Sequence, residues 1–377
     1  MNIVTKIKQL IEKLCPNGIS YKELQDILTI KNGSDYKNLG EGDFPVYGSG
    51  GIMTYVDRFA YGKPSVLIPR KGSIDKLYYV DTPFWNVDTI FYTEINTDVA
   101  IPKFVFYCLQ KQHLEELNTA GGVPSLTQKV LNKVKIPVPP LPVQEEIVRI
   151  LDTFTELTTE LTTELTTRKQ QYEHYTYQLL NFDDTVQTHQ LRELIDFRNG
   201  KGHEKDIVSD GKYIVVNSKF ISTNGEVKKY SNKQICPLFV DDILMVMSDL
   251  PNGRALAKCF LVAEDDKYTL NQRIGAFHVK DESVIKTKFL LYVLNRNQQL
   301  LRYDNGVDQT NLRKDDILDI MIPVPSIEEQ ERIVAILDRF DTLCNDISEG
   351  LPAEIEARQK QYEYYRDKLL TFKEKVN

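Results

Sequence analysis

The chain has 377 residues, a formal net charge of −7 at pH 7 and a pI near 5.5. This length allows two or more domains, and the acidic balance excludes a simple basic protein that coats nucleic acid. The 5 cysteines are odd in number and none forms a Cys-x-x-Cys pair, which excludes a disulfide framework and a zinc ribbon and favours the reducing cytoplasm.

The N-terminal part of the chain predicts one helix followed by a lobe of strands. Residues 1–14 place apolar and charged side chains at the spacing of an amphipathic helix, not of a signal peptide. No apolar run reaches the roughly 18 residues of a membrane span. Over 19–135, short apolar runs alternate with glycine-rich turns, which predicts a mixed, strand-rich lobe. We expect strands at 44–47, 65–69, 77–80 and 89–92 and a helix over 102–117.

A proline-rich segment ends this lobe and a long helix follows. The prolines of residues 136–142 allow only an extended chain. From Val143 the apolar residues recur at steps of three and four, which is typical of a helix packed lengthwise on another helix. Within it, Thr-Glu-Leu-Thr occurs three times over residues 155–166. Threonine is a middling helix former, so this run is either a low-complexity linker or a helix held by a partner, and the flanking apolar steps favour the helix.

A second lobe and a second long helix complete the chain. Residues 183–325 predict another strand-rich lobe, with strands at 213–216, 243–247, 259–262 and 275–279 and a helix over 288–301. Ser326 and Glu329 fit a capping box that begins the second long helix. Gly350 and Pro352 interrupt its apolar steps, so we expect a kink or a break there.

The two halves of the chain repeat one another. Ile-Pro-Val-Pro and the following Gln-Glu…Ile-Val…Ile-Leu-Asp-x-Phe begin at Ile136 and again at Ile322. Each copy is followed by a long helix that ends in Gln-Tyr-Glu-x-Tyr and Leu-Leu-x-Phe. Weaker pairings match residues 21–24 with 191–194 and residues 31–33 with 198–200. The repeating unit is therefore a lobe followed by a helix.

This repeat predicts an α+β, pseudo-twofold fold. Two mixed strand-rich domains, 1–140 and 183–325, alternate with two helices, 141–182 and 326–377. The simplest packing lays the helices side by side as an antiparallel coiled coil, with the lobes at opposite ends. Two DNA-binding lobes held at a fixed distance from one another would suit a bipartite site on duplex DNA.

The doubled motif resembles the specificity subunits of type I restriction-modification systems, and the resemblance covers the whole chain. It implies that the lobes are target-recognition domains and that the two helices form a spacer. The Thr-Glu-Leu-Thr run resembles the spacer repeats of that family. The implied partners are double-stranded DNA, two methyltransferase subunits and an endonuclease subunit that translocates DNA. We expect no cofactor in this chain, because S-adenosylmethionine, ATP and Mg²⁺ would belong to the partners.

Base-reading side chains are expected on turns beside glycines, where the backbone can approach DNA. Each residue taken alone is equally an ordinary solvated turn residue. The candidates in the first lobe are Tyr47, Ser49, Arg70, Lys71, Ser73, Ser125 and Gln128. The candidates in the second lobe are Asn199, Lys201, Asn217, Ser218, Lys219, Arg254, Gln272, Arg273, Gln309 and Asn311.

The helices carry tyrosines that suit two roles. They either fill the seam between the helices or form a platform for partner subunits, and the continued apolar steps favour the seam. Outward contact is better suited to the glutamates at the start of each helix. The tyrosines are 172, 175, 362 and 365, and the glutamates are Glu145, Glu146, Glu328 and Glu329.

The sequence carries no recognisable catalytic motif. It has no phosphate-binding Gly-x-x-x-x-Gly-Lys loop, no Asp-Pro-Pro-Tyr loop and no histidine or cysteine spacing for a metal. We therefore expect a subunit without catalytic activity of its own and without a metal site. The alternatives are a self-contained DNA methyltransferase or nuclease with unrecognised motifs, or a scaffold whose lobes bind proteins.

Overall fold

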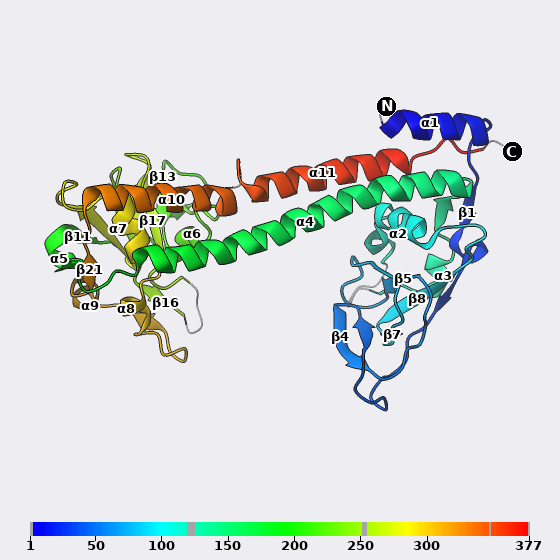
Figure 1. Ribbon diagram of the computed structural model, residues 1–377, viewed down its shortest axis with the longest axis horizontal. Coiled ribbons are helices and arrows are strands. Elements are labelled where there is room, and N and C mark those ends of the chain that lie inside the picture. Colours follow the sequence, from blue (N-terminus) through cyan, green and yellow to red (C-terminus); the bar gives the residue numbers. More distant parts are fainter. Residues whose placement is uncertain (1–2, 119–124, 251–254, 347, 376–377) are drawn as a thin grey trace. The chain divides into compact units, whose positions relative to one another are not determined.

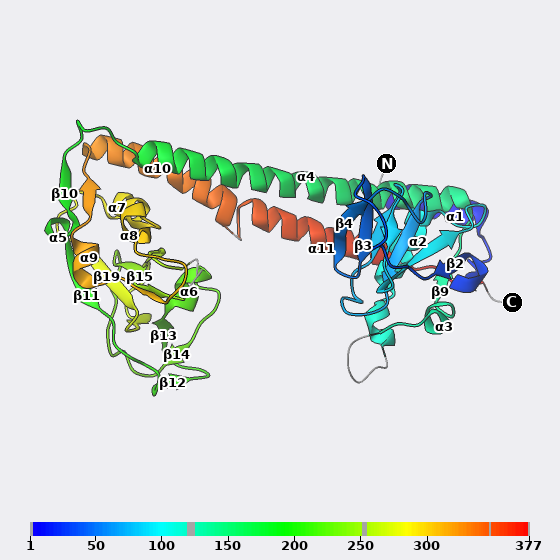
Figure 2. The same ribbon diagram turned by 90° about the horizontal axis from the view of Figure 1, so that it is seen from below.

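The computed structural model describes residues 3–118, 125–250, 255–346 and 348–375 (Figures 1 and 2). The chain forms two compact units: residues 1–164 with 352–377, and residues 165–351. Each unit contains a strand-rich lobe, one part of the long helix α4 (Leu141–Leu180) and a shorter helix packed along that part. Within the described ranges, no helix combines the length and apolar character that crossing a bilayer requires.

The first unit holds a four-stranded and a three-stranded sheet, in the orders β2-β8-β5-β6 and β4-β3-β7, and a small pair β1-β9. Its helices are α1 (Ile3–Leu14), α2 (Pro102–Lys111), α3 (Gln128–Leu131) and α11 (Leu351–Leu369), with 3-10 turns at Leu24–Asp26 and Leu114–Leu117. Its strands are β1 (Tyr21–Glu23), β2 (Leu28–Lys31), β3 (Phe44–Gly48), β4 (Gly51–Val56), β5 (Ser65–Pro69), β6 (Tyr78–Val80), β7 (Trp85–Asn86), β8 (Ile90–Ile95) and β9 (Lys135–Pro137).

The second unit repeats this plan with the sheets β11-β19-β15-β17 and β12-β14-β13-β18 and the pairs β10-β21 and β16-β20. Its helices are α5 (Leu191–Leu194), α6 (Ser218–Ser222), α7 (Thr287–Leu294), α8 (Gln298–Leu301), α9 (Lys314–Leu318) and α10 (Ile327–Asn345). Its strands are β10 (Thr188–Gln190), β11 (Ile195–Asn199), β12 (Ile207–Val208), β13 (Tyr213–Val216), β14 (Tyr230–Ser231), β15 (Ile243–Val246), β16 (Ser248–Asp249), β17 (Cys259–Leu261), β18 (Tyr268–Leu270), β19 (Ile274–Val279), β20 (Thr310–Asn311) and β21 (Met321–Pro323).

The strands expected from the sequence are confirmed within a few residues, but both expected lobe helices are interrupted. The helix expected over 102–117 ends at Lys111, because His113 takes a left-handed backbone with φ 47° before a 3-10 turn. The helix expected over 288–301 divides into α7 and α8. Asn297 begins α8, and its side chain accepts a hydrogen bond from the backbone of Gln299.

The Thr-Glu-Leu-Thr run is helical throughout, which confirms the helix interpretation. Its threonine hydroxyls donate to carbonyl oxygens one turn earlier: Thr158 to Phe154 at 2.9 Å and Thr159 to Thr155 at 2.9 Å. Thr162 does the same to Thr158. The hydroxyls are thus satisfied by carbonyl oxygens of the helix itself, which they share with the backbone N–H groups.

The seam along α4 is aromatic, and the partner helix in each unit runs antiparallel to it (Figures 1 and 2). In the first unit the rings of Phe154 and Tyr365 stack with centroids 5.2 Å apart. In the second, Tyr172 stacks on Phe340 at 6.0 Å and Tyr175 lies 5.5 Å from the same ring. The expected seam role is therefore confirmed for Tyr172, Tyr175 and Tyr365, although Tyr175 keeps one side exposed, whereas Tyr362 packs against α2.

Tyr362 is the most enclosed of these tyrosines. Its hydroxyl donates to Oε1 of Gln110 at 2.7 Å, and burial raises its pKa to about 12. The hydroxyl therefore stays protonated and keeps donating at physiological pH. This contact joins α11 to α2 within the first unit.

The ends of the second long helix follow the sequence only in part. Ser326 accepts from the backbone of Glu329 as a cap, but the Glu329 carboxylate pairs with Arg332 and so does not complete the expected box. The expected break is present, because α10 ends at Asn345 and α11 begins at Leu351.

Glu146 was expected to face outward, and this is wrong. Its side chain is buried and accepts from Lys6 Nζ at 3.0 Å and from Arg149. The hydrogen bond from Arg149, supported by the contact with Lys6, lowers the pKa of the Glu146 carboxyl. The residue thereby fastens α1 to α4.

A buried glutamine fastens the first lobe to α4. Gln144 has no exposed surface. Its Oε1 accepts from the backbone N–H of Ile101 at 2.9 Å, and its Nε2 donates to the carbonyl oxygens of Val99 at 3.0 Å and Pro139 at 2.7 Å. One amide thus satisfies the strand-to-helix loop before α2 and the proline segment before α4, groups that would otherwise be buried unpaired.

The second lobe repeats this bracket at the equivalent residue. Gln330 is also fully buried. Its Oε1 accepts from Lys286 N at 2.8 Å, and its Nε2 donates to Val284 O at 3.0 Å and Pro325 O at 2.9 Å. The glutamine of the Gln-Glu motif is therefore the mounting point of each lobe on its helix.

A tyrosine–aspartate–lysine contact joins each lobe to its helix at a second point, about two helical turns beyond the glutamine. In the first unit Tyr107 donates to Asp152 at 2.5 Å and Lys103 Nζ lies 2.9 Å from the same carboxylate. Burial, followed by the hydrogen bond to the carboxylate, raises the pKa of the Tyr107 hydroxyl well above its usual range. The second unit repeats the contact with Lys288, Tyr292 and Asp338.

One of the weaker repeat pairings is corrected by the strand register. Tyr21 lies opposite Pro137 and Thr188 lies opposite Pro323, so Tyr21 corresponds to Thr188. Leu24 consequently corresponds to Leu191, and the pairing of residues 21–24 with 191–194 is wrong by three residues. The similarity of the two tetrapeptides suggested the wrong pairing. The backbone hydrogen bonds of β1 with β9 and of β10 with β21 fix the correct register.

We expect Gln144→Met and Gln330→Met each to leave three buried backbone groups without a hydrogen-bond partner. Each variant should lower the free energy of unfolding by about 3 kcal/mol, which corresponds to a fall of about 6–12 °C in denaturation temperature. Thermal unfolding of the full chain measures this loss. Gln170→Met, at an exposed position of α4, serves as the matched control and should change the temperature little. Loss of stability in the control equal to that in the two bracket variants would contradict the mounting role.

Candidate nucleic-acid interface

In the first lobe, turns from distant parts of the chain meet at one edge, which we call turn edge 1 (residues 48–51, 70–73, 87–89 and 125). Thr89 joins two of them: its Oγ1 accepts from Ser49 N at 3.3 Å and its carbonyl accepts from Arg70 N at 2.9 Å. Lys71 pairs with Ser125 as an isolated antiparallel bridge. Four of the candidate residues are thereby brought together.

The second lobe forms the same edge, which we call turn edge 2 (residues 217–219, 247–249, 271–273 and 309–311). Asn271 N donates to Val216 O at 3.1 Å, as Val87 does to Tyr47 in the first lobe. Met247 N donates to Arg273 O at 3.0 Å. Gln309 Nε2 donates to Ser248 Oγ at 2.8 Å, and Asn311 is the strand partner of Ser248.

A glycine in each lobe allows the chain after the first sheet strand to lie against this edge. A Cβ on Gly33 would lie 2.1 Å from the carbonyl oxygen of Val87, and a Cβ on Gly200 would lie 1.9 Å from that of Asn271. No side chain fits at these distances. The pairing of residues 31–33 with 198–200 is therefore confirmed.

Lys201 is held beside turn edge 2 by a buried histidine. The Nδ1 of His203 lies 2.7 Å from the carbonyl oxygen of Lys201, and its Nε2 lies 2.9 Å from the hydroxyl of Thr269. Because a carbonyl only accepts, Nδ1 carries the proton. His203 thus positions the loop, and Lys201 itself is exposed and pairs with Asn271.

Equivalent positions at the two edges differ in chemistry. Arg70 follows β5, and its guanidinium lies over the ring of Phe91 at 5.0 Å. Its Nε is buried and has no hydrogen-bond partner in the described part of the chain. The equivalent residue of the second lobe is Met247, which has no charge. The two edges are therefore built alike but present different groups.

Two first-lobe candidates, Tyr47 and Gln128, use their side chains in structural contacts, and a third, Ser73, lies half-buried in a turn. Tyr47 packs its ring against Tyr78 and Phe84, and burial raises the pKa of its hydroxyl. Gln128 donates to Ile30 O and to Asn32 Oδ1, both at 3.3 Å. Ser73 is half-buried in the turn before β6, where its carbonyl accepts from Lys76.

The second-lobe candidates divide in the same way. Asn217 caps α6 by accepting from Phe220 N at 2.9 Å, which leaves Ser218 and exposed Lys219 in the first turn of that helix. Gln272 donates to Glu204 at 3.2 Å, and Asn199 is exposed at the end of β11. Arg254 lies outside the described residues.

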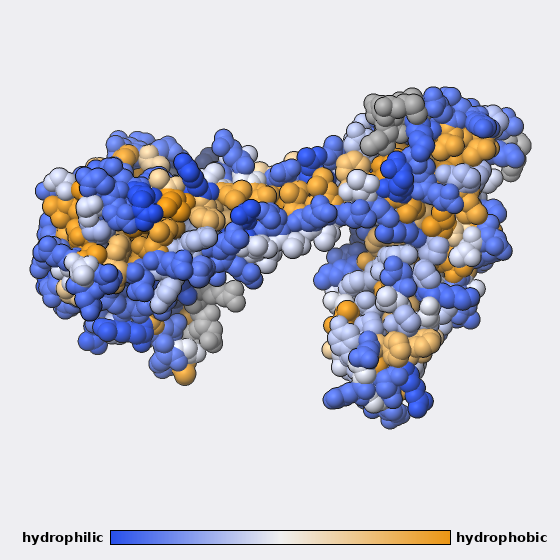
Figure 3. All heavy atoms as spheres, viewed as in Figure 1, coloured by the Kyte–Doolittle hydropathy of each residue, from blue (hydrophilic) through white to orange (hydrophobic). Residues whose placement is uncertain are grey.

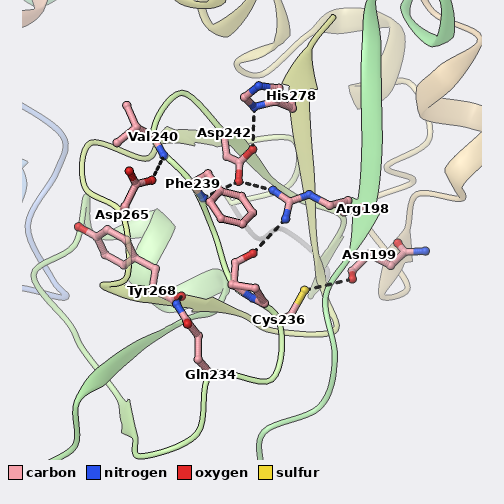
Figure 4. Close-up of polar contacts among 11 residues, drawn as sticks. Arg198, Asn199, Gln234, Cys236, Phe239, Val240, Asp242, Asp265, Tyr268 and His278 are labelled. Atoms are coloured by element: carbon pink, nitrogen blue, oxygen red, sulfur yellow. Dashed lines mark hydrogen bonds and ion pairs between the residues drawn. The ribbon is translucent and has the colours of Figure 1, made fainter.

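A second polar cluster lies before β15, at the other end of the strand from turn edge 2 (Figure 4). The fully buried carboxylate of Asp242 forms an ion pair with Arg198, lies 3.1 Å from Nδ1 of His278 and accepts from Phe239 N at 2.8 Å. The cluster fixes the loop before β15 to the neighbouring strands. In the ranges that the structure describes, no group of three or more histidine, cysteine or acidic side chains could hold a metal.

Sequence reasoning missed several residues of the edges, among them Thr89 and Ser248. A cleft of about 820 Å³ beside turn edge 1 is lined by others, including Asp35, Lys37, Ile52, Met53 and Asp88. The sequence signal for these turns was weak: Val87-Asp-Thr and Asn271-Gln-Arg share only their position before an isoleucine, Ile90 and Ile274. Their letters differ, so only the backbone bonds reveal the correspondence.

Comparison with known proteins is decisive at this point. Residues 16–168 and 183–357 both match the family model of the type I restriction modification DNA specificity domain. The chain belongs to this family. It is 29% identical to a putative type I restriction enzyme specificity subunit of Haemophilus influenzae, over 97% of this chain and 99% of that one. It is 34% identical to the EcoR124I/EcoR124II specificity subunit of Escherichia coli, over 74% of this chain and 73% of the relative.

Solved structures share the fold. The crystal structure of the S subunit of a type I restriction-modification system from M. genitalium superposes with a TM-score of 0.60 at 16% identity, covering 94% of this chain and 96% of that one. A second solved chain comes from a study of complex assembly and conformational transition of the type I R-M system. It superposes with a TM-score of 0.58 at 14% sequence identity, covering 94% of this chain and 98% of that one. The predicted α+β fold and the family resemblance are therefore confirmed, and the specificity subunits are the DNA-recognition, not the catalytic, members of these systems.

We expect Gly33→Ala and Gly200→Ala to displace the turn that each glycine touches and to cost about 2 kcal/mol, because backbone cannot give way by this much cheaply. Unfolding measurements on the full chain test this. Gly50→Ala is the control, since nothing lies within 4 Å of its added Cβ. Equal stability of all three variants would contradict the close approach.

Proposed function

We propose that the first and second lobes each read one half of a bipartite duplex DNA site through turn edges 1 and 2. The observation that carries this proposal is the recurrence of one edge, built from the same backbone bonds, with different side chains at equivalent positions. Different readers on one scaffold suit an asymmetric site. Polar and basic side chains on glycine-bordered turns suit base edges and phosphates.

We further propose that residues 1–140 and 183–325 are the two target-recognition domains and that residues 141–182 and 326–377 are the spacer helices. The continuity of α4 over 40 residues supports this, because one helix of about 60 Å then links the two readers. Each tetrapeptide adds about 6 Å, which is close to two base-pair steps. The number of tetrapeptides would therefore set the spacing between the half-sites.

The partners follow from the family and from the repeat. We infer two methyltransferase subunits, because the repeat offers two equivalent helix surfaces, with exposed Glu145 on one and the equivalent, exposed Glu331 on the other. An endonuclease subunit joins the complex, and S-adenosylmethionine, ATP and Mg²⁺ act in those partners. Since the substrate is chromosomal or invading DNA, the complex works in the cytoplasm.

Mapping of methylated adenines after co-expression with the methyltransferase partner tests the proposed function. A single uninterrupted recognition sequence would contradict it. Methyl transfer or cleavage by the purified chain alone would favour an enzyme. Absence of any salt-dependent affinity for duplex DNA would favour a protein-binding scaffold, since phosphate contacts require a steep salt dependence.

Deletion of residues 159–162 should change the spacing of the recognised halves and leave both half-sites unaltered. The four residues shorten the helix by about 6 Å without touching either edge. The double variant Thr159→Ala with Thr162→Ala keeps the length and serves as the control, which should keep the original spacing. An altered half-site in the deletion variant would contradict the proposal that the number of tetrapeptides sets the spacing between the half-sites.

Arg70→Ala should weaken binding about 10- to 100-fold and relax the requirement at one position of one half-site, as loss of a bidentate arginine does. Arg273→Ala should act only on the other half. Competition binding with single-base variants of the mapped site measures both. Arg192→Ala removes an exposed arginine that pairs with Asp319, away from turn edge 2, and should leave specificity unchanged. Unchanged specificity in Arg70→Ala and Arg273→Ala would remove both residues from the interface.

A further inference from the structure

The strand β4 of the first lobe exposes an unusual series of large apolar side chains. Ile52 is 50% exposed, Met53 56%, Tyr55 51% and the following Phe59 50%. Hydrophobic atoms framed by hydrophilic ones are visible in Figure 3 where β4 lies in Figure 1. Single exposed apolar residues are ordinary, but a cluster on an edge strand indicates an interaction surface.

This strand forms a hairpin with β3 at the edge of the three-stranded sheet β4-β3-β7, and the tip of this hairpin, which we call the β3–β4 ribbon, carries almost no side chains. β3 and β4 pair antiparallel, with Tyr47 opposite Ile52 and Gly48 opposite Gly51, so the turn consists of Ser49 and Gly50. Gly51 has φ +117°, a conformation that suits glycine. Nothing lies within 4 Å of a Cβ added to Gly50. The backbone at the tip is therefore free to approach a large partner closely.

The ribbon is continuous with turn edge 1. Ser49 at its tip is bonded to Thr89, and Ile52 and Met53 line the adjoining cleft together with Asp35, Lys37 and Thr89. Apolar and polar groups thus converge on one concave surface. A protein face that reads base edges needs this mixture, since polar groups pair with donors and acceptors while apolar groups meet methyl groups.

We propose that the β3–β4 ribbon enters the major groove of the half-site read by the first lobe, and that Ile52 and Met53 contact the C5-methyl group of a thymine there. The major groove admits a two-stranded ribbon, and the thymine methyl is the apolar group that it presents to a protein. This inference rests on the proposed function. It goes further by predicting that this half-site contains a thymine.

The second lobe does not share this device, which makes the contact specific to one half. Where β3 turns into β4 in the first lobe, β13 runs into the short helix α6, and the strand beside β13 is β14, which comes only at residues 230–231. The first turn of α6 presents Ser218 and Lys219 instead of an isoleucine and a methionine. The contact made by Ile52 and Met53 therefore has no counterpart at the equivalent position of the second lobe.

The test removes only the thymine methyl group from the DNA, and only the two apolar side chains proposed to contact it from the protein. Using the full chain in complex with its methyltransferase, each thymine of the mapped site is replaced singly by uracil, and duplex affinity is measured by competition. At one position of one half-site we expect the wild type to bind the uracil duplex about fourfold more weakly, the value of one buried methyl group. Ile52→Ala with Met53→Ala should bind both duplexes equally, at the weaker affinity.

The controls separate this inference from the proposed function and from misfolding. Leu14→Ala, at an exposed apolar residue of α1, should keep the full difference between thymine and uracil. Thymines of the other half-site should respond alike in wild type and double variant, which also shows that the variant is folded. Absence of any thymine effect in the wild type, or an effect that persists in the double variant, would overturn the inference while leaving the bipartite reading intact. Loss of all duplex binding by the wild type would instead overturn the proposed function.

Discussion

The architecture depends on one neutral side chain used twice. Gln144 and Gln330 each close three hydrogen bonds to backbone groups of the loop before the lobe's helix and of the proline segment, in positions without exposed surface. Buried backbone groups are costly when unpaired, so the bracket admits only one orientation of each lobe on its helix segment. The tyrosine–aspartate–lysine contacts further along each helix hold the same orientation at a second point.

A fixed mount leaves the opposite edge of each lobe free to vary. The strands that carry turn edges 1 and 2 pair in the same register, and the same backbone bonds hold their turns. The groups on those turns nevertheless differ: Arg70 corresponds to Met247, and a ribbon corresponds to α6. Stability and recognition are thus assigned to different residues. Substitutions at the edges change what is presented without disturbing the mount.

The sequence predicted the parts of the fold that follow from periodicity and repetition. The apolar steps of α4 and the glycine break before α11 act locally, and both were found where expected. The proline segment is extended only as far as Pro140, and the expectation for 136–142 is wrong at its end: Leu141 and Pro142 already form the first turn of α4, where proline is tolerated because its missing N–H has no helical partner there. The lobe helices were predicted as continuous because the reversal at His113 has no strong local signal. Glu146 was wrongly predicted to face outward because its partner Lys6 is distant in sequence. The structural role of Gln144 was not predicted, because it bonds to backbone groups that the sequence motif does not identify. At the edges, glycine and polar content identified Ser49 and Gln309, whereas Thr89, Ile52 and Met53 are assembled by strand register, which composition does not reveal.

The choice of an uncharged amide for the mount has a consequence for behaviour in salt. Ions screen attraction between charges but scarcely affect a buried bond between an amide and a carbonyl. Contacts with phosphate, in contrast, weaken steeply as ions are added. Rising ionic strength should therefore release the nucleic acid while the first lobe stays mounted on α4 and the second on α10, so that binding is reversible without loosening the two mounts.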